Sequence, residues 1–139
     1  MDEQLTSLTI TEAAKLLAAR EISPVELTQA HLKRIEQVNP TLNAFITLTA
    51  EQAMRQAQQA EQEIRQGEHK GPLQGIPLAL KDLFETEGVR TTAGSSFFAG
   101  HVPEDDAASV EKLKSSGAVL LGKLNMHEIA LGVTNENPQ

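Results

Sequence analysis

The sequence has no cysteine, no tryptophan and no tyrosine, and only four phenylalanines among its 139 residues. The absence of cysteine excludes a disulfide framework, thiolate chemistry and a cysteine-based zinc site, and it fits a protein of the cytoplasm. With so few aromatic rings, the chain has little to stack on nucleic-acid bases, as single-strand binders commonly do. Disulfide-held and base-stacking proteins are therefore the first classes excluded.

Positive charge and long apolar runs are also scarce. The chain has 12 Lys and Arg against 19 Asp and Glu, a net charge of -7, and its basic residues are dispersed rather than clustered. We therefore expect no direct contact with nucleic acid. The first residues are acidic and polar, unlike a signal peptide, and no apolar run approaches the length of a membrane span. No membrane partner is expected, and the cytoplasm is the expected location.

The chain is long enough for one domain with a buried core, residues 1–139, whose first part, residues 1–69, is mainly helical in pattern. Two pairs of residues have the spacing of capping boxes and each predicts a helix start: Thr9 with Glu12, and Ser23 with Glu26. The second helix should end at Asn39-Pro40. Alternation over residues 42–48 predicts a strand, and residues 50–66 predict a helix that packs through a narrow stripe of small apolar residues.

The second part, residues 70–139, has short apolar runs separated by glycines. A run that ends at Lys81 predicts a buried strand, and residues 118–122 predict another. A helix between them should begin at Asp105 or Asp106. Strand, helix and strand in this order predict a βαβ unit with parallel strands, and hence an α/β fold. A further helix is expected over residues 125–132, followed by a terminal loop.

Lys81 stands at the carboxyl end of the first predicted strand, where open α/β sheets place their reacting groups. Because that strand is apolar almost throughout, we expect the lysine to be partly desolvated, which would lower its pKa toward the range of a general base. The alternative is an ordinary solvated charge that keeps the strand end soluble.

Other groups of polar residues give weaker indications of a functional site. His127 and Glu128 lack the second histidine that zinc proteases need, and the glycines match no phosphate-binding pattern, so no metal and no cofactor are expected. Asp82 and Glu85 could form a carboxylate pair, although solvated loop charges are the favoured interpretation. The hydroxyls of residues 91–96 either face a ligand or satisfy a turn of their own backbone.

The second part resembles the amidase signature family in the order and spacing of three stretches: GPLQGIPLALKD, TTAGSSFF and HVPEDDAASVEKLKSSGAVLLGKLNMHEIALG. The segments SPVEL and VNPTLNAFI extend the resemblance over nearly the whole chain. It implies the N-terminal part of the amidase signature fold, in which helices are followed by βαβ units of a mostly parallel, mixed sheet. The βαβ part, residues 70–139, would carry the lysine motif.

In that family, a Ser-cisSer-Lys triad hydrolyses or transfers amide nitrogen, and its lysine lies in the motif GxPxxxKD. The resemblance therefore implies that Lys81 is catalytic. As a neutral amine it would accept a proton through the bridging serine and return it to the leaving amine. Asp82 would support the lysine loop, and neither Ser95 nor Ser96 matches the nucleophile. The implied enzyme is an amidase, a hydrolase of C–N bonds that acts on a small-molecule amide.

The two family serines belong to a GGSSGGS-like motif and its following helix, which this sequence does not contain. We therefore expect this polypeptide to be inactive alone. It would act as the N-terminal portion of an amidase, or of a glutamyl-tRNA amidotransferase A subunit, completed by the missing C-terminal portion. The alternative is a truncated, non-catalytic remnant that serves as a binding module. Open strand edges and uncovered apolar surface would drive self-association into a homodimer or larger assembly.

Overall fold

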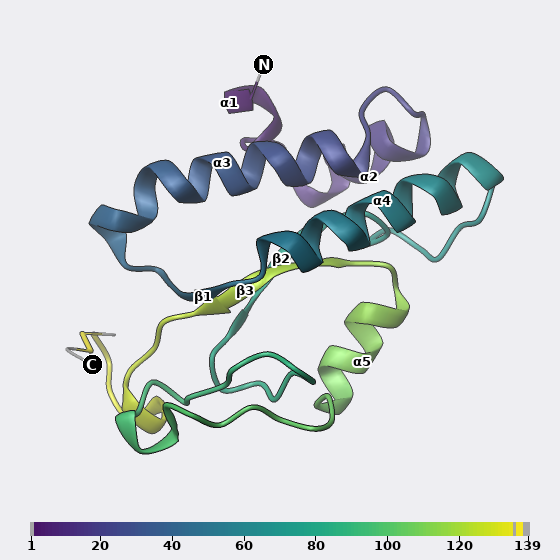
Figure 1. The fold of residues 1–139 in the computed structure, drawn as a ribbon. Helices are drawn as coiled ribbons and strands as arrows, with labels where there is room; N and C mark the ends of the chain where they lie inside the picture. Colours follow the sequence, from purple (N-terminus) through teal and green to yellow (C-terminus); the bar gives the residue numbers. More distant parts are fainter. Residues whose placement is uncertain (1, 135, 138–139) are drawn as a thin grey trace.

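The computed structural model describes residues 2–134 and 136–137. In chain order, its elements are α1 (Asp2–Leu5), α2 (Ile10–Ala18), α3 (Pro24–Leu42), β1 (Phe45–Leu48), α4 (Ala50–Gln66), β2 (Pro77–Lys81), the 3₁₀ turn η1 (Ser96–Phe98), α5 (Ala108–Ser115), β3 (Val119–Leu124) and the 3₁₀ turn η2 (Glu128–Ala130). Figure 1 shows the three strands in the middle of the molecule, with α3 and α4 on one side and α5 with long loops on the other. No helix of the described residues is long and apolar enough to cross a membrane.

Both predicted capping boxes form, at the starts of α2 and α3. The predicted end of α3 is wrong, because the helix continues through Pro40 to Leu42, where Asn43 closes it in a left-handed conformation. Pro40 lies in the last turn, so its ring removes only a single backbone hydrogen bond. The side chain of Asn39 then binds the backbone N–H and carbonyl of Phe45 at 2.8 and 3.2 Å, which connects the end of the helix to β1.

The sheet has the strand order β1-β3-β2, in which β3 pairs parallel with β2 and antiparallel with β1. The βαβ unit β2-α5-β3 and the mixed sheet are therefore confirmed. A bulge shifts the register between the pairs Leu78–Leu120 and Ala79–Gly122. Gly122, at φ +155°, passes so close to β1 that a Cβ atom there would lie 2.2 Å from the carbonyl oxygen of Thr47.

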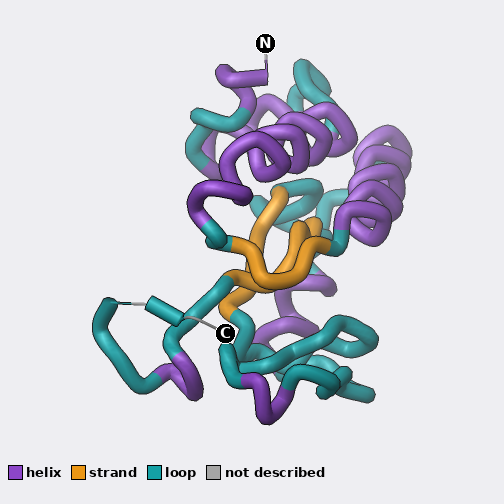
Figure 2. Tube along the Cα trace, turned by 60° about the vertical axis from the view of Figure 1, so that its left-hand side comes forward, coloured by secondary structure: helices purple, strands orange, loops and turns teal. Residues whose placement is uncertain are grey.

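Each face of the sheet has its own apolar core. Val119 and Leu121 of β3 pack against the helices, where Ala53 and Ala57 of α4 are fully buried. The prediction that this helix packs through small residues is thus confirmed. On the other face, three buried residues from β2, α5 and β3 form a second cluster: Leu80, Val110 and Leu120. The strands therefore separate a helical half from a loop-rich half (Figure 2).

Two predicted elements differ from those observed. α5 begins at Ala108 without a side-chain cap, because Asp106 instead accepts a hydrogen bond from the Glu87 N–H at 2.8 Å and pairs with Lys114. The helix predicted over residues 125–132 is only η2, since Ile129 and Ala130 have positive φ values that a helix does not allow. Of the predicted terminal loop, residues 135, 138 and 139 lie outside the described residues.

Candidate active site

Lys81 is the last residue of β2, and the parallel register places it opposite Leu124 at the end of β3. Its neighbour Leu80 belongs to the cluster on the α5 face, so Lys81 points to the opposite face of the sheet. The predicted position at a strand end is confirmed. The expected desolvation is wrong, because the Lys81 side chain is exposed. In the part of the chain that the structure describes, β2 is an edge strand and residues 77–79 are only half-buried, so little apolar surface surrounds Lys81.

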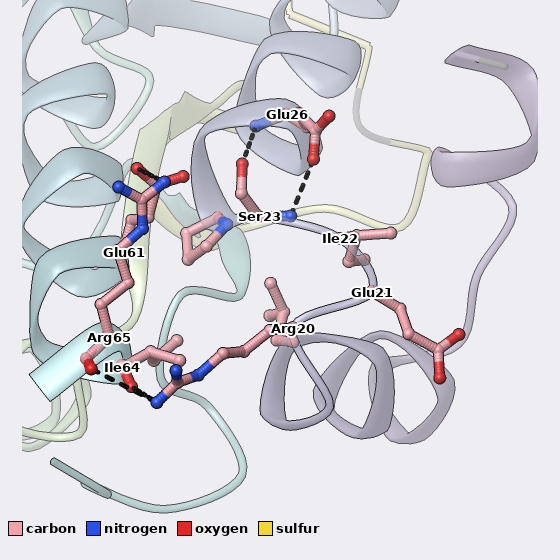
Figure 3. Close-up of a pocket in the computed structure, with 10 residues that line it drawn as sticks. Arg20, Glu21, Ile22, Ser23, Glu26, Glu61, Ile64 and Arg65 are labelled. Atoms are coloured by element: carbon pink, nitrogen blue, oxygen red, sulfur yellow. Dashed lines mark hydrogen bonds and ion pairs between the residues drawn. The ribbon is translucent and has the colours of Figure 1, made fainter. Parts of the chain in front are cut away.

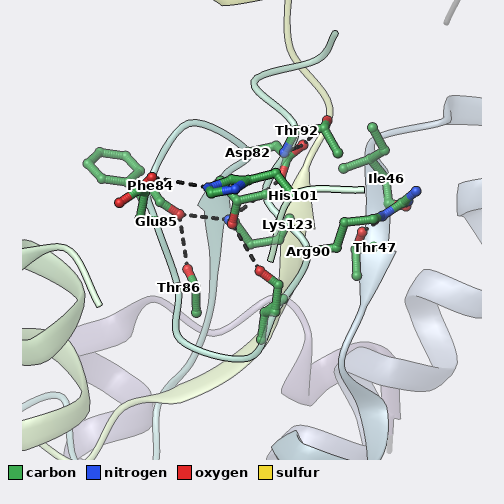
Figure 4. A network of polar contacts seen from close by, with 12 residues as sticks. Ile46, Thr47, Asp82, Phe84, Glu85, Thr86, Arg90, Thr92, His101 and Lys123 are labelled. Carbon is green, nitrogen blue, oxygen red and sulfur yellow. Dashed lines mark hydrogen bonds and ion pairs between the residues drawn. The ribbon is translucent and has the colours of Figure 1, made fainter. Parts of the chain in front are cut away.

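A buried ion pair, which the sequence pattern did not predict, lies on the other face of the same strand ends (Figure 4). Lys123 Nζ is 3.5 Å from Asp82 Oδ1, and both side chains are fully buried. The same Nζ donates hydrogen bonds to the carbonyl oxygen of Phe84 at 2.7 Å and to Thr91 Oγ1 at 2.6 Å. The available signal was a lysine within an apolar strand, because a buried lysine needs a partner.

Asp82 is held from several directions. Its Oδ2 accepts hydrogen bonds from the N–H of Thr92 at 3.0 Å and from the Thr92 hydroxyl. Its Oδ1 has no hydrogen-bond partner among the described residues, so the charge of Lys123 is its compensation. The backbone N–H of Asp82 donates to the Leu124 carbonyl at 3.0 Å, and its own carbonyl accepts from the Ala93 N–H at 2.8 Å. The residue that follows Lys81 therefore has a fixed position.

The electrostatics of Lys123 combine two opposing effects. Burial lowers the pKa of Lys123 because it disfavours the ammonium form, and the neighbouring carboxylate of Asp82 opposes this shift only in part. The pKa therefore stays below its ordinary value. The ammonium form of Lys123 depends on Asp82 for its stability.

The hydroxyls of residues 91–96 satisfy their own backbone only in part: Thr91 Oγ1 donates to the Val89 carbonyl at 3.0 Å, and Thr92 Oγ1 accepts from the Gly94 N–H at 3.2 Å. Thr91, Thr92 and Ser95 are buried. The two threonine hydroxyls bind the ion pair, and Ser95 Oγ donates to Glu128 Oε1 at 2.7 Å. These three hydroxyls are therefore engaged with other groups of the chain.

The carboxylate pair of Asp82 and Glu85 was the less favoured interpretation, and it does not form. The favoured one, solvated loop charges, is correct for Glu85 but wrong for Asp82, which is fully buried. Glu85 is exposed and lies 3.2 Å from His101 Nε2, whereas Asp82 is buried against Lys123, so the two carboxylates do not form a catalytic pair. Within residues 2–134 and 136–137, no group of three or more histidine, aspartate or glutamate side chains is placed to hold a metal ion.

A hollow of about 130 Å³ lies in the helical half, where α4 ends beside the connection of α2 to α3 (Figure 3). Arg20 donates to the carbonyl oxygens of Ile64 and Arg65 at 3.0 and 3.3 Å, and so caps the end of α4. Arg65 is paired with Glu61 at 3.1 Å. Because its arginines are engaged with neighbouring groups, we interpret this hollow as a junction between helices, separate from the strand ends that carry Lys81.

The strand ends carry an exposed lysine on one face and a buried ion pair on the other. The segment with these features lies within the range matched by a protein-family model. The Amidase family model matches residues 26–139, a range that includes both lysines and Asp82. The chain belongs to the Amidase family.

Several curated relatives are components of an amidotransferase. The chain is 53% identical over 128 residues to the A subunit of the glutamyl-tRNA(Gln) amidotransferase of Methylococcus capsulatus, and 50% identical over 133 residues to its counterpart in Dehalococcoides mccartyi. These matches cover 92% and 96% of this chain but only 26% and 27% of the relatives. The chain thus spans about a quarter of the length of the curated relatives it matches.

Solved amidase structures share the fold. The native peptide amidase of Stenotrophomonas maltophilia matches with a TM-score of 0.83 and 38% identity, over 88% of this chain and 25% of that one. A chain from a vestigial protein complex, described as revealing the origins of an s-triazine catabolic enzyme, matches with a TM-score of 0.89 and 37% identity, over 94% of this chain and 29% of its own. The predicted fold class is confirmed.

Proposed function

We propose that this chain supplies the catalytic lysine of an enzyme that hydrolyses or transfers amide nitrogen, with Lys81 as the group that moves the proton. The observation that carries the proposal is the GxPxxxKD motif at the carboxyl end of β2, where Lys81 is an exposed residue at a fixed strand end. A neutral amine there can accept a proton from a serine hydroxyl and return it to the leaving amine. The serines of the Ser-cisSer-Lys triad would come from outside these 139 residues, so the chain alone would be inactive.

Sequence identity favours one substrate class over the other. Eight curated relatives, at 46% to 53% identity, are all named as the A subunit of glutamyl-tRNA(Gln) amidotransferase, whereas the peptide amidase is 38% identical. We therefore place a role in tRNA-dependent amide transfer, with glutamine as nitrogen donor, ahead of simple amide hydrolysis.

The test is ammonia release from glutamine and from a panel of simple amides. It is measured for the chain alone and for the chain co-expressed with the remaining C-terminal part of the Methylococcus relative. We expect activity only in the pair, with glutamine preferred, and a loss of roughly 100-fold or more in Lys81→Ala, because general-base catalysis contributes on this scale. Lys112→Ala is the matched control, because Lys112 is an exposed lysine on α5. Full activity of the pair that carries Lys81→Ala would overturn the proposal. Activity of the chain alone would contradict the statement that the catalytic serines come from outside these 139 residues.

A further inference from the structure

We propose that the buried Asp82–Lys123 ion pair is a positioning device for Lys81, which fixes the loop that leaves β2 and so holds the catalytic lysine in a single orientation. This inference rests on the proposed function, because it assigns a purpose to the surroundings of Lys81. It concerns groups on the far face of the sheet that touch no reacting atom.

The strand register places the Asp82–Lys123 ion pair and the Lys81 side chain on opposite faces of the sheet. Lys123 lies directly opposite Leu80, and paired residues of neighbouring strands point to the same face. Leu80 packs on the α5 face, so Lys123 does as well, and Asp82 meets it there. Lys81, between Leu80 and Asp82, points the other way. Its two neighbours in the chain are therefore fixed on one face, while its own side chain is left free on the other.

The ion pair also forms hydrogen bonds with both ends of the segment that follows Lys81. Lys123 Nζ binds the Phe84 carbonyl near the start of that segment and Thr91 Oγ1 near its end. Asp82 Oδ2 binds both the N–H and the hydroxyl of Thr92. Residues 83–92 thus form a loop whose two ends converge on the residue after Lys81, and a displacement of either end would be transmitted to the end of β2.

Stability alone does not explain a charged pair at this place. Two well-packed apolar side chains of similar volume would be about as stable as a buried ion pair, because the charges must leave water. Apolar side chains would not specify the backbone carbonyl and the two threonine hydroxyls that the pair binds. Directional hydrogen bonds of this kind select one loop conformation, which is what a catalytic lysine needs from its support.

The first readout needs no activity and uses the 139-residue chain. In Lys123→Met we expect amide hydrogen exchange to accelerate at least tenfold over residues 83–93, while the amides of α3 and α4 keep their rates. The Lys81 Cε signal in a carbon-13 NMR titration should split or broaden as the side chain samples several environments. Lys114→Met, which removes the lysine of the partly buried pair with Asp106, is the matched control and should leave the Lys81 signal unchanged.

The second readout is the kinetics of the chain paired with its C-terminal counterpart. A positioning role predicts that Lys123→Met lowers kcat roughly 100-fold with KM within about twofold, since small misplacements of a catalytic group cost on this order. If Lys123→Met does not fold, the double variant Asp82→Asn with Lys123→Met removes both charges and is measured in its place. Wild-type kcat in a folded variant, with Lys81→Ala inactive, would overturn this inference alone. Full activity of Lys81→Ala would instead overturn the proposed function, and unchanged exchange over residues 83–93 would overturn the positioning role by itself.

Discussion

At the scale of single residues, Gly122 allows β1 and β3 to approach closely because it has no Cβ atom. A Cβ atom at this position would meet the Thr47 carbonyl oxygen at 2.2 Å and Leu48 Cα at 3.1 Å, both of them backbone atoms that cannot rotate away. We predict that Gly122→Ala lowers the free energy of unfolding by about 2–4 kcal/mol, through overpacking and a positive φ. Chemical denaturation measures the difference. Gly100→Ala is the control, because a Cβ there meets nothing within 4 Å, and an equal loss in both variants would contradict the steric explanation.

The sequence specifies Lys81 more clearly than Lys123, for a physical reason. Lys81 ends an apolar run within a contiguous motif, so its place at a strand end can be predicted from local pattern. The face on which Lys123 lies depends on the bulge before Gly122, which changes the phase of β3. Its partner Asp82 comes from another strand end, and no local spacing connects the two. The exposure of Lys81 likewise depends on which elements cover β2, and the strand's own residues do not determine this.

At the scale of elements, the end of α4 is fixed to the segment before β2 through Glu63. Its carboxylate accepts hydrogen bonds from Lys70 Nζ at 2.6 Å, from Gln59 at 3.0 Å and from Gln74 at 3.3 Å. Burial raises the pKa of Glu63, but these three hydrogen bonds outweigh burial and the pKa is lowered overall. The charged form is therefore the one that stabilises the fold.

This shift has a definite sign in a pH titration of stability. A carboxylate whose pKa is lowered on folding contributes stability above its unfolded pKa of about 4.3, and this contribution is lost as the pH falls through the lower folded value. We predict that Glu63→Gln costs about 1–3 kcal/mol at pH 7 and flattens the loss of stability below about pH 4.5. Thermal unfolding between pH 3 and 7 is the measurement. Glu36→Gln, at an exposed position of α3, should change the stability little at any pH. If Glu63→Gln loses stability below about pH 4.5 as steeply as the wild type does, Glu63 is not a cause of that loss.

Element boundaries that rest on local signals were predicted better than boundaries that rest on tertiary contacts. The capping boxes of α2 and α3 are local signals, formed by residues three apart, and both helices begin where these signals place them. The end of α3 beyond Pro40 depends on Asn39 binding the backbone of Phe45, and the start of α5 depends on Asp106 pairing with Lys114. Tertiary contacts of this kind override local propensity, and sequence pattern alone does not contain them.

At the scale of the whole molecule, exposed apolar side chains predict self-association of the 139-residue chain. Phe97, Leu131 and Val133 are 85%, 80% and 97% exposed, and β1 and β2 form the two edges of the described sheet. Large exposed apolar groups and open edges favour contact with another copy. We predict a dimer or larger assembly in size-exclusion chromatography with light scattering at micromolar concentration.

Substitution tests which surface is responsible. The double variant Leu131→Lys with Val133→Lys should shift the assembly toward monomer. Ile10→Lys, at an apolar position of the helical half that is 57% exposed, should not. A stable wild-type monomer would contradict the prediction.

The strand order also determines when the sheet can form during synthesis on the ribosome. Of the three strands in the described residues, β3 is made after β1 and β2, yet it lies between them. Among the described strands, β3 is the partner of both β1 and β2, so neither is paired until residue 124 has left the exit tunnel, whereas α3 and α4 can already pack on each other. The nascent chain therefore passes through a stage with a helical layer formed and two strands unpaired. Apolar strand residues are exposed at that stage, which ends when residues 119–124 have left the tunnel and β3 can pair with both neighbours.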